Sequence, residues 1–298
     1  MDNQNPYGAG GGGYPGGGGG MTPGALDVGD VLSTTFRTMG AAIVPILGCA
    51  LSVVIPTSVL NFGVSVGVYY ITQEALRTSG PEAMTAMLLI FPLTFGVALV
   101  AIALQAVGQG GIVYAVAEQL SGRSPSIGQA FRVGISRAFW MFLTNLLLFL
   151  AVMIGTLMCI APGVIAGIFL SVAAPVCIVE KLGPIDSISR SIQLTEGNRL
   201  NIFLIGLAVL VGWMVVAFCI LMPVQMLVIG GSAAVGGQAG IQAMQDPLSF
   251  GQIITQIVNI PVTLFATMAG STLVAVIYAR LRGLRDGVDA QAIASVFS

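Results

Sequence analysis

The stretch AFWMFLTNLLLFLAVMIGTLMCIAPGVIAGIFLSVAAPVCIVE, from Ala138 to Glu180, decides the fold class of this chain. Between Arg137 and Glu180 lie 42 residues without an Asp, Glu, Lys or Arg, about twice the ~20 apolar residues that cross a bilayer as a helix. Pro162 and Gly163 interrupt the stretch, because proline cannot continue the helical hydrogen-bond ladder and glycine tolerates turn geometry. The stretch therefore predicts a membrane hairpin, two crossings joined by a tight extracytoplasmic turn at these two residues.

The composition of the whole chain agrees with a membrane protein. Of its 298 residues, 56% are hydrophobic and 8% are charged, against about 25% charged residues in soluble domains. The 11 basic residues and net charge of -1 give no clustered basic surface for a nucleic-acid partner. We therefore expect the lipid bilayer as the main partner. The cysteines lie in uncharged segments without C-x-x-C spacing and are expected to be packed thiols: Cys49, Cys159, Cys177 and Cys219.

Four more crossings are expected outside this hairpin. They occupy residues 38–73, 83–117, about 200–228 and part of 247–279, with a loop between Gly230 and Asp246. Residues 38–73 are 36 uncharged positions, which as a helix would reach about 54 Å and exceed a ~30 Å hydrocarbon core. That segment must tilt, kink or protrude. A count of four or eight crossings would need the long segments to be reassigned in pairs.

The chain divides into three parts by composition. Residues 1–24 are rich in Gly, Tyr and Pro and predict a disordered cytoplasmic tail. Residues 25–285 form the six-helix transmembrane domain, and residues 286–298 form a short cytoplasmic tail that has room for a short helix at 288–296. Ten of the eleven basic residues fall on one side of the predicted crossings. By the positive-inside rule that side, with both termini, is cytoplasmic.

An internal repeat is visible in the layout of the crossings. Each hairpin follows an amphipathic segment, the first of which covers residues 26–39. Residues 126–132 align without gaps on residues 184–190, which places Arg132 opposite Arg190, and Glu118 and Glu180 also take equivalent places. Chance similarity among apolar sequences is the alternative. The predicted fold is all-α, a polytopic membrane helix bundle of six transmembrane helices in three hairpins, each preceded by a cytoplasmic amphipathic helix.

The second half of the hairpin predicted at Ala138–Glu180 and the segment after it resemble a known family. The matching motifs are Pro162-Gly163-Val164, residues 171–176 (SVAAPV), Glu180, Gly183-Pro184, Ser189-Arg190-Ser191 and residues 194–199 (LTEGNR). They are similar to the membrane domain associated with glycerophosphoryl diester phosphodiesterases, well over 125–210, loosely over 26–124 and weakly beyond 230. The resemblance implies a six-helix protein of the bacterial inner (cytoplasmic) membrane, usually without an assigned activity. Some relatives are fused to a soluble phosphodiesterase barrel, for which this chain has no room.

Catalysis is not expected from this sequence. The chain has no His, which excludes Ser-His or Cys-His nucleophile activation and His-containing metal sites. No acidic residue lies within the long apolar segments. We therefore expect no catalytic residue, no metal and no cofactor. The candidate structural or docking residues on the cytoplasmic side are Glu118, Arg132, Glu180 and Arg190, with ion pairs that orient the amphipathic helices as the favoured role of the acids.

Polar residues within the crossings are the remaining functional hints. The candidate buried polar residues are Asn61, Gln105, Gln109, Asn145, Gln256 and Asn259. Hydrogen bonds between helices are the default role, each worth about 1 kcal/mol or less. A polar translocation path is the alternative. The sequence thus favours a non-catalytic membrane scaffold or accessory subunit of a complex with other membrane proteins or with itself; a small transporter or channel that uses these polar positions, and an intramembrane enzyme, remain open.

Overall fold

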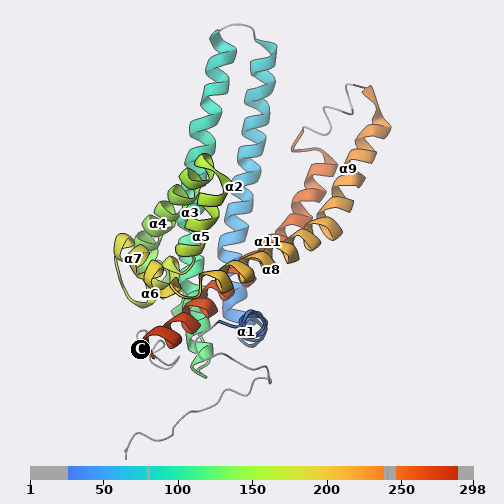
Figure 1. Cartoon of the computed structure of the whole chain (residues 1–298). Helices are drawn as coiled ribbons and strands as arrows, with labels where there is room; N and C mark the ends of the chain where they lie inside the picture. Colours follow the sequence, from blue (N-terminus) through green and yellow to red (C-terminus); the bar gives the residue numbers. More distant parts are fainter. Residues whose placement is uncertain (1–25, 79–80, 238–239, 241–245, 288–298) are drawn as a thin grey trace, which may run out of the picture.

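A computed structural model describes residues 26–78, 81–237, 240 and 246–287 (Figure 1). Every regular element in these ranges is helical. Six helical segments are long and apolar enough to cross a membrane, which confirms the all-helical class and the expected number of long apolar segments. The predicted tail at 1–24 and the short helix at 288–296 lie outside the described residues.

The first unit of the chain is a short helix followed by a long hairpin. Helix α1 (Val28–Ala41) begins where the Asp27 side chain accepts a hydrogen bond from the Asp30 N–H, an N-terminal cap that satisfies a free backbone donor. A single residue, Ala42, separates it from α2 (Ile43–Arg77). Helix α3 (Pro81–Leu120) returns along α2. The amphipathic helix predicted at 26–39 is confirmed.

The second unit differs from the prediction at its start and at its turn. Helix α4 (Ile127–Met158) begins after Ser126, whose hydroxyl caps the helix by accepting the Gln129 N–H at 3.3 Å. It then runs without a break into the membrane crossing, so the expected separate amphipathic helix is the first part of α4. The chain turns at Cys159, the only residue between α4 and α5 (Ile160–Phe169).

The turn was therefore predicted three residues too late. Pro162 lies in the first turn of α5, where a helix has no use for the backbone N–H that proline lacks. Gly163 also lies inside α5, and a Cβ there would meet the Thr156 hydroxyl oxygen at 2.2 Å. This glycine serves the close approach of α4 and α5 and not the turn. After Phe169 the crossing is interrupted again before α6 (Ala173–Val179).

The third unit begins with a separate helix, α7 (Pro184–Thr195), which ends shortly before Gly197, a glycine with a φ of 86°. The fifth crossing is α8 (Arg199–Val216), a π-helical turn η1 (Ala217–Leu221) and α9 (Met222–Val235). The loop predicted from Gly230 starts later, because α9 continues to Val235, and part of it lies outside the described residues. Helix α11 (Phe250–Asp286) is the sixth crossing.

The helices gather around α3, which contacts α2, α4, α6, α11 and α1. In Figure 1, α2 and α3 form the tallest hairpin, while α8, α9 and the start of α11 lean away from it. The closest approaches use glycine: a Cβ at Gly108 would meet Val53 of α2 at 2.1 Å, and a Cβ at Gly110 would meet the Gly134 Cα of α4 at 2.8 Å. Small residues at such crossings let helix backbones pack closely in a membrane.

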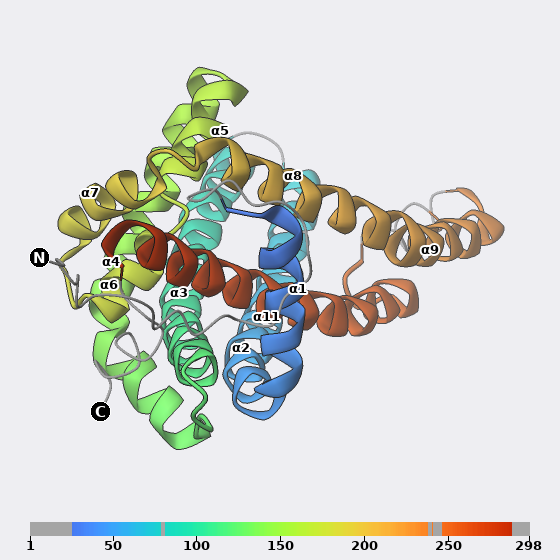
Figure 2. The same cartoon turned by 60° about the horizontal axis from the view of Figure 1, so that its bottom comes forward.

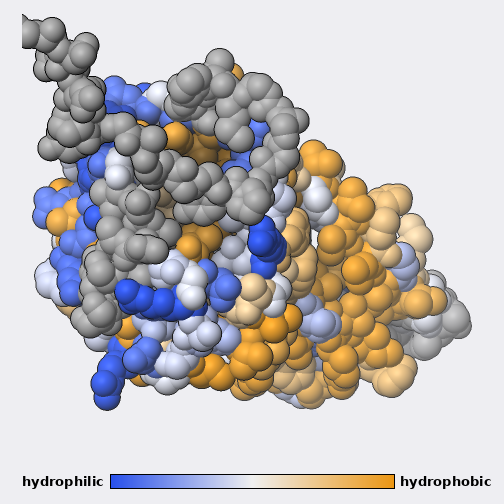
Figure 3. Space-filling model, turned by 90° about the horizontal axis from the view of Figure 1, so that it is seen from below, coloured by the Kyte–Doolittle hydropathy of each residue, from blue (hydrophilic) through white to orange (hydrophobic). Residues whose placement is uncertain are grey.

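One end of the molecule is hydrophilic, whereas the segment formed by α8, α9 and the start of α11 is hydrophobic. Figure 2 shows the hydrophilic end, with α1, α7 and the end of α11, turned towards the viewer. The segment formed by α8 and α9 extends to the right. Seen from below, blue and white residues cover much of the left of the molecule, while orange residues cover the right (Figure 3). We call the hydrophilic end the base: α1, the end of α3, the start of α4, α6, α7 and the end of α11.

Candidate functional site

The last turns of α11 hold the other elements of the base together. Polar side chains between Tyr278 and Asp286 reach α1, the end of α6, α7 and the residue after α7. Helix α11 is continuous from Phe250 to Asp286. The polar residues at its end are therefore held at fixed positions relative to its apolar part. The candidate site is this set of polar contacts.

Glu180, which caps the C-terminus of α6, is the acceptor at the centre of the base. One carboxylate oxygen accepts from the Tyr278 hydroxyl at 3.1 Å, and the other accepts from Arg190 Nε at 3.1 Å. The Tyr278 hydroxyl in turn accepts from Arg282 at 3.0 Å. Three elements, α6, α7 and α11, therefore meet at one carboxylate.

Asp286 provides a second carboxylate to the same arginine. The guanidinium of Arg190 donates from Nη2 to Asp286, and Arg282 Nε lies 3.9 Å from Asp286 and 4.0 Å from Glu180. Burial disfavours the Arg190 charge, but Glu180 and Asp286 outweigh this effect and raise the pKa of Arg190 above its ordinary value. We call Glu180, Arg190, Tyr278, Arg282 and Asp286 the ion cluster.

The partners in the ion cluster depend on one another because they are largely shielded from water. The side chains of Glu180 and Arg190 are 14% and 26% exposed. Removing one partner of a shielded ion pair leaves the other charge without compensation, which costs more than the pair contributes over an apolar replacement. The cluster is therefore better explained as a device that fixes the positions of three elements than as a source of large stability.

Three further polar contacts attach α1 and the α7–α8 connection to the rest of the base. Arg280 forms an ion pair with Asp30 of α1 at 2.9 Å, and the buried Asn198 side chain accepts the Leu26 N–H at 3.0 Å. Arg285 pairs with Glu196 at 2.7 Å. The hydrogen bond and positive charge of Arg285 lower the pKa of Glu196. Both separate amphipathic helices are thus fastened to the bundle by specific polar contacts.

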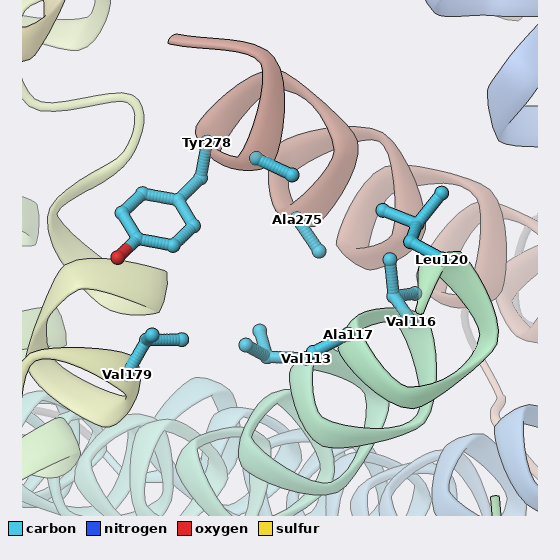
Figure 4. Close-up of a pocket in the computed structure, with 8 residues that line it drawn as sticks. Val113, Val116, Ala117, Leu120, Val179, Ala275 and Tyr278 are labelled. Atoms are coloured by element: carbon cyan, nitrogen blue, oxygen red, sulfur yellow. The ribbon is translucent and has the colours of Figure 1, made fainter. Parts of the chain in front are cut away.

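A small apolar hollow lies beside the ion cluster, between α3, α6 and α11 (Figure 4). Its lining is Val113, Val116, Ala117, Leu120, Val179, Ala275, Tyr278 and Ala279. In Figure 4 the Tyr278 hydroxyl points towards α6, where Glu180 accepts its hydrogen bond. The hollow offers no free polar group for a substrate. Among the described residues, no group of three or more acidic or cysteine side chains could hold a metal ion.

The structure separates residues that the repeat made equivalent. Arg190 and Glu180 bind each other, whereas Glu118 is buried and pairs with Arg123 at 3.8 Å. Arg132 is exposed on α4, and within the described ranges it forms no ion pair. Its position therefore suits contact with lipid headgroups or another protein, and that of Arg190 does not.

The polar residues predicted within the crossings differ in burial and in hydrogen-bond partners. Asn145 of α4 donates to Gln109 of α3 at 3.1 Å, a hydrogen bond between helices. Asn61 is exposed and donates to the Thr57 carbonyl of its own helix at 2.8 Å, and Gln105 is exposed too. The prediction that these two residues are buried is wrong, because no other helix in the described part of the chain covers their faces of α2 and α3. Two more residues, Gln256 and Asn259, are half-buried on α11.

Sequence reasoning missed the α11 side of the base. The candidate residues predicted from the sequence do not include Tyr278 or Arg282, and Asp286, predicted to begin the C-terminal tail, ends α11 and pairs with Arg190. Their spacing of four residues was a usable signal, since side chains at i and i+4 lie on one face of a helix. That face alone does not reveal the distant partners, Asp30, Glu180 and Arg190.

Comparisons with protein-family models, curated proteins and solved structures found no match to this chain. The resemblance of residues 125–210 to the membrane domain associated with glycerophosphoryl diester phosphodiesterases stays a prediction.

Proposed function

We propose that this chain is a non-catalytic scaffold or accessory subunit of a protein complex in the bacterial cytoplasmic membrane. Its base and both termini lie in the cytoplasm in this proposal. Ten of the eleven basic residues belong to or adjoin elements of the base, while Arg77 ends α2 at the opposite end. An excess of basic residues on one side of a membrane protein is typical of its cytoplasmic side.

The observation that carries the proposal is the way in which the base is held together. The basic side chains of α11 and α7 are used in contacts within the chain, which fix α1 and α7 against the bundle. On the start of α4, Arg132 stays exposed beside the exposed apolar side chain of Ile135, and the same helix face continues to the exposed Phe139. A rigid base with a mixed basic and apolar surface suits the binding of another protein.

The interior of the bundle supports the same proposal over a transporter. The apolar stretches of the crossings contain no Asp, Glu, Lys, Arg or His in the sequence, and ionisable groups at membrane depth are the usual mark of a proton or ion pathway. The polar pair Gln109 and Asn145 is satisfied by a hydrogen bond between α3 and α4. Helix packing therefore accounts for both residues without a translocation path.

The proposal is tested by changing the exposed surface of α4 without touching the ion cluster. The platform variant combines Arg132→Gln with Ile135→Gln. Its matched control combines Arg77→Gln with Leu76→Gln, an exposed arginine and an exposed leucine at the opposite end of the molecule. After mild solubilisation, we expect the platform variant to lose copurifying subunits and to migrate as a smaller species on native gels, while the control behaves like the wild type and both insert normally.

Two results would contradict the proposal. The first is a platform variant that retains every partner of the wild type. The second is a wild-type protein that purifies without partners and, after reconstitution into liposomes, conducts ions or moves a solute. In the second case, the transporter takes the place of the scaffold.

A further inference from the structure

The fifth crossing contains a local break in its α-helical hydrogen bonds. Between α8 and α9 the turn η1 is π-helical, and the Met222 N–H donates to the Ala217 carbonyl, five residues back instead of four. The next residue, Pro223, has no N–H and removes a further donor from the helix. Single π-helical turns and prolines are the usual causes of bends in long helices. The fifth crossing is therefore easiest to bend at η1.

The sixth crossing has a comparable break within α11. Pro261 lies inside this helix, so the Ile257 carbonyl cannot receive the hydrogen bond that residue 261 would otherwise donate. The end of α11 beyond this point is fixed in the base by the ion cluster. Pro261 therefore separates the start of α11 from the part that is attached to the base.

The breaks in the two crossings lie at the same level. A Cβ added at Gly251 of α11 would meet Cγ1 of Val228 in α9 at 2.7 Å, so these two residues face each other. Ten residues beyond Gly251 along α11 is Pro261. Ten residues before Val228 along the antiparallel fifth crossing is Phe218, inside η1. Because α11 also contacts η1 directly, the two weakened segments lie side by side.

The α2–α3 hairpin also contains two prolines, but they lie at different levels. Val53 of α2 lies against Gly108 of α3, so Pro56, three residues beyond Val53, is level with Gln105 of α3. The proline of α3, Pro92, is 13 residues away from Gln105, which is about 20 Å along the helix. Each of these prolines therefore lies beside an uninterrupted stretch of the partner helix.

The outer part of the fifth and sixth crossings packs mainly on itself. We call α9 together with residues 250–260 of α11 the outer unit. In the described part of the chain, α9 contacts mainly η1 and α11, and its side chains Met226 and Leu227 are 70% and 77% exposed. Gly251 lets the Val228 side chain pack directly on α11. Figure 1 shows the outer unit leaning away from the α2–α3 hairpin.

We propose that the outer unit moves as one body about a hinge formed by η1 and Pro261. The end of α11 stays fixed in the base, while the outer unit changes its angle to the α2–α3 hairpin. Because both weakened segments lie at one level, the two helices bend together and do not have to slide past each other. The α2–α3 hairpin does not bend in this way, because an unbroken helix supports each of its prolines.

Distances between pairs of spin labels test the hinge in the full-length protein reconstituted into liposomes. The native cysteines are replaced by alanine, and each label is attached to a cysteine at an exposed position. Positions 44 and 227 (Val44 and Leu227) span the hinge, positions 44 and 204 (Leu204) stay on the base side of it, and positions 227 and 257 lie within the outer unit. We expect the distance distribution of the hinge-spanning pair to be about twice as wide as that of either other pair.

Replacing the prolines tests whether the two breaks cause this width. Pro223→Ala with Pro261→Ala restores both N–H donors and should narrow the 44–227 distribution to the width of the 44–204 distribution. Pro56→Ala with Pro92→Ala is the matched control, which restores as many donors in the α2–α3 hairpin and should leave the 44–227 distribution unchanged.

Three results would overturn the hinge. Equal widths for all three wild-type pairs would show that the outer unit is fixed relative to the base. A wide 227–257 distribution would show that the outer unit is not one body. A 44–227 distribution that the Pro223→Ala and Pro261→Ala pair does not narrow, or that the control pair narrows equally, would show that η1 and Pro261 are not its cause.

Discussion

The start of α4 and helix α7 occupy the same place in the repeat but are attached to the bundle in different ways. Residues 126–132 and 184–190 align without gaps. The first segment continues into its membrane crossing, whereas the second is a separate helix that ends before Gly197. One sequence pattern therefore supports two kinds of attachment, and the surroundings of each segment decide which is used.

Close backbone contact holds the start of α4. Ala130 is fully buried, and a Cβ added at Gly134 would meet the Val107 carbonyl oxygen of α3 at 2.3 Å. A Cβ at Gly111 of α3 would meet the Ala130 carbonyl oxygen at 3.1 Å. With the backbones this close, the charged residue Arg132 has no part in the attachment and stays exposed.

Side-chain polar contacts hold α7. Arg190 joins it to Glu180 and Asp286, and the buried Ser191 hydroxyl donates to the Phe169 carbonyl at 2.8 Å. Because α7 is not continuous with a crossing, these contacts replace the backbone continuity that fixes the start of α4. The attachment of α7 is consequently sensitive to charge, and that of α4 is sensitive to volume.

The largest expected effect comes from adding one methyl group at Gly134. Gly134→Ala should lower the free energy of unfolding by about 1–3 kcal/mol, the usual cost of overpacking, because the new Cβ meets backbone that cannot rotate away. SDS titration in mixed micelles measures this change.

Gly128→Ala is the matched control on the same helix, since a Cβ at Gly128 meets nothing within 4 Å. It should leave stability unchanged or raise it by up to about 1 kcal/mol, the difference in helix propensity between glycine and alanine. Equal losses for both variants would refute the assignment of close packing to the start of α4.

A smaller effect is expected from acid at the end of α7. The pKa of Glu196 is lowered in the folded protein by Arg285, with a further contribution from Arg199. A carboxylate with a depressed pKa stabilises the folded state above its unfolded pKa of about 4.5, and this contribution is lost as the pH falls through the lower, folded value. Glu196 is well exposed, so the effect should be small.

The check is the thermal unfolding midpoint of the wild type and of Glu196→Gln as a function of pH. The wild type should have the higher midpoint above pH 4.5, and the two proteins should converge as the pH falls below that value. A difference that is constant or that grows in acid would exclude the Glu196–Arg285 pair as its cause.

The sequence was sufficient for the helical class and the long apolar segments because those follow from local composition. It placed the turn at Pro162 and Gly163 instead of Cys159 because proline and glycine have two uses. Proline is tolerated in the first turn of a helix as well as in a loop, and glycine allows close packing as well as a turn. Which use applies depends on α4, a partner that the local pattern does not contain.

The candidate site could be predicted only where partners are near in sequence. Glu180 was expected to pair with a neighbouring basic residue, and Arg190 is ten positions away. Tyr278 and Asp286 lie about a hundred residues from their partners, and nothing in the local pattern connects them. The same limit explains Arg132: its equivalence to Arg190 holds in sequence and fails in structure because no part of α11 pairs with it.

Two double-mutant cycles test most directly the claim that ion pairs hold α7 and not the start of α4. One cycle uses Glu180→Gln and Arg190→Gln; the other uses Glu118→Gln and Arg132→Gln, the equivalent residues of the second unit. Measured by SDS titration, the first cycle should give a coupling energy of about 1–2 kcal/mol, and the second should be additive to within about 0.5 kcal/mol. Additivity in the first cycle, or equal coupling in both, would contradict the account.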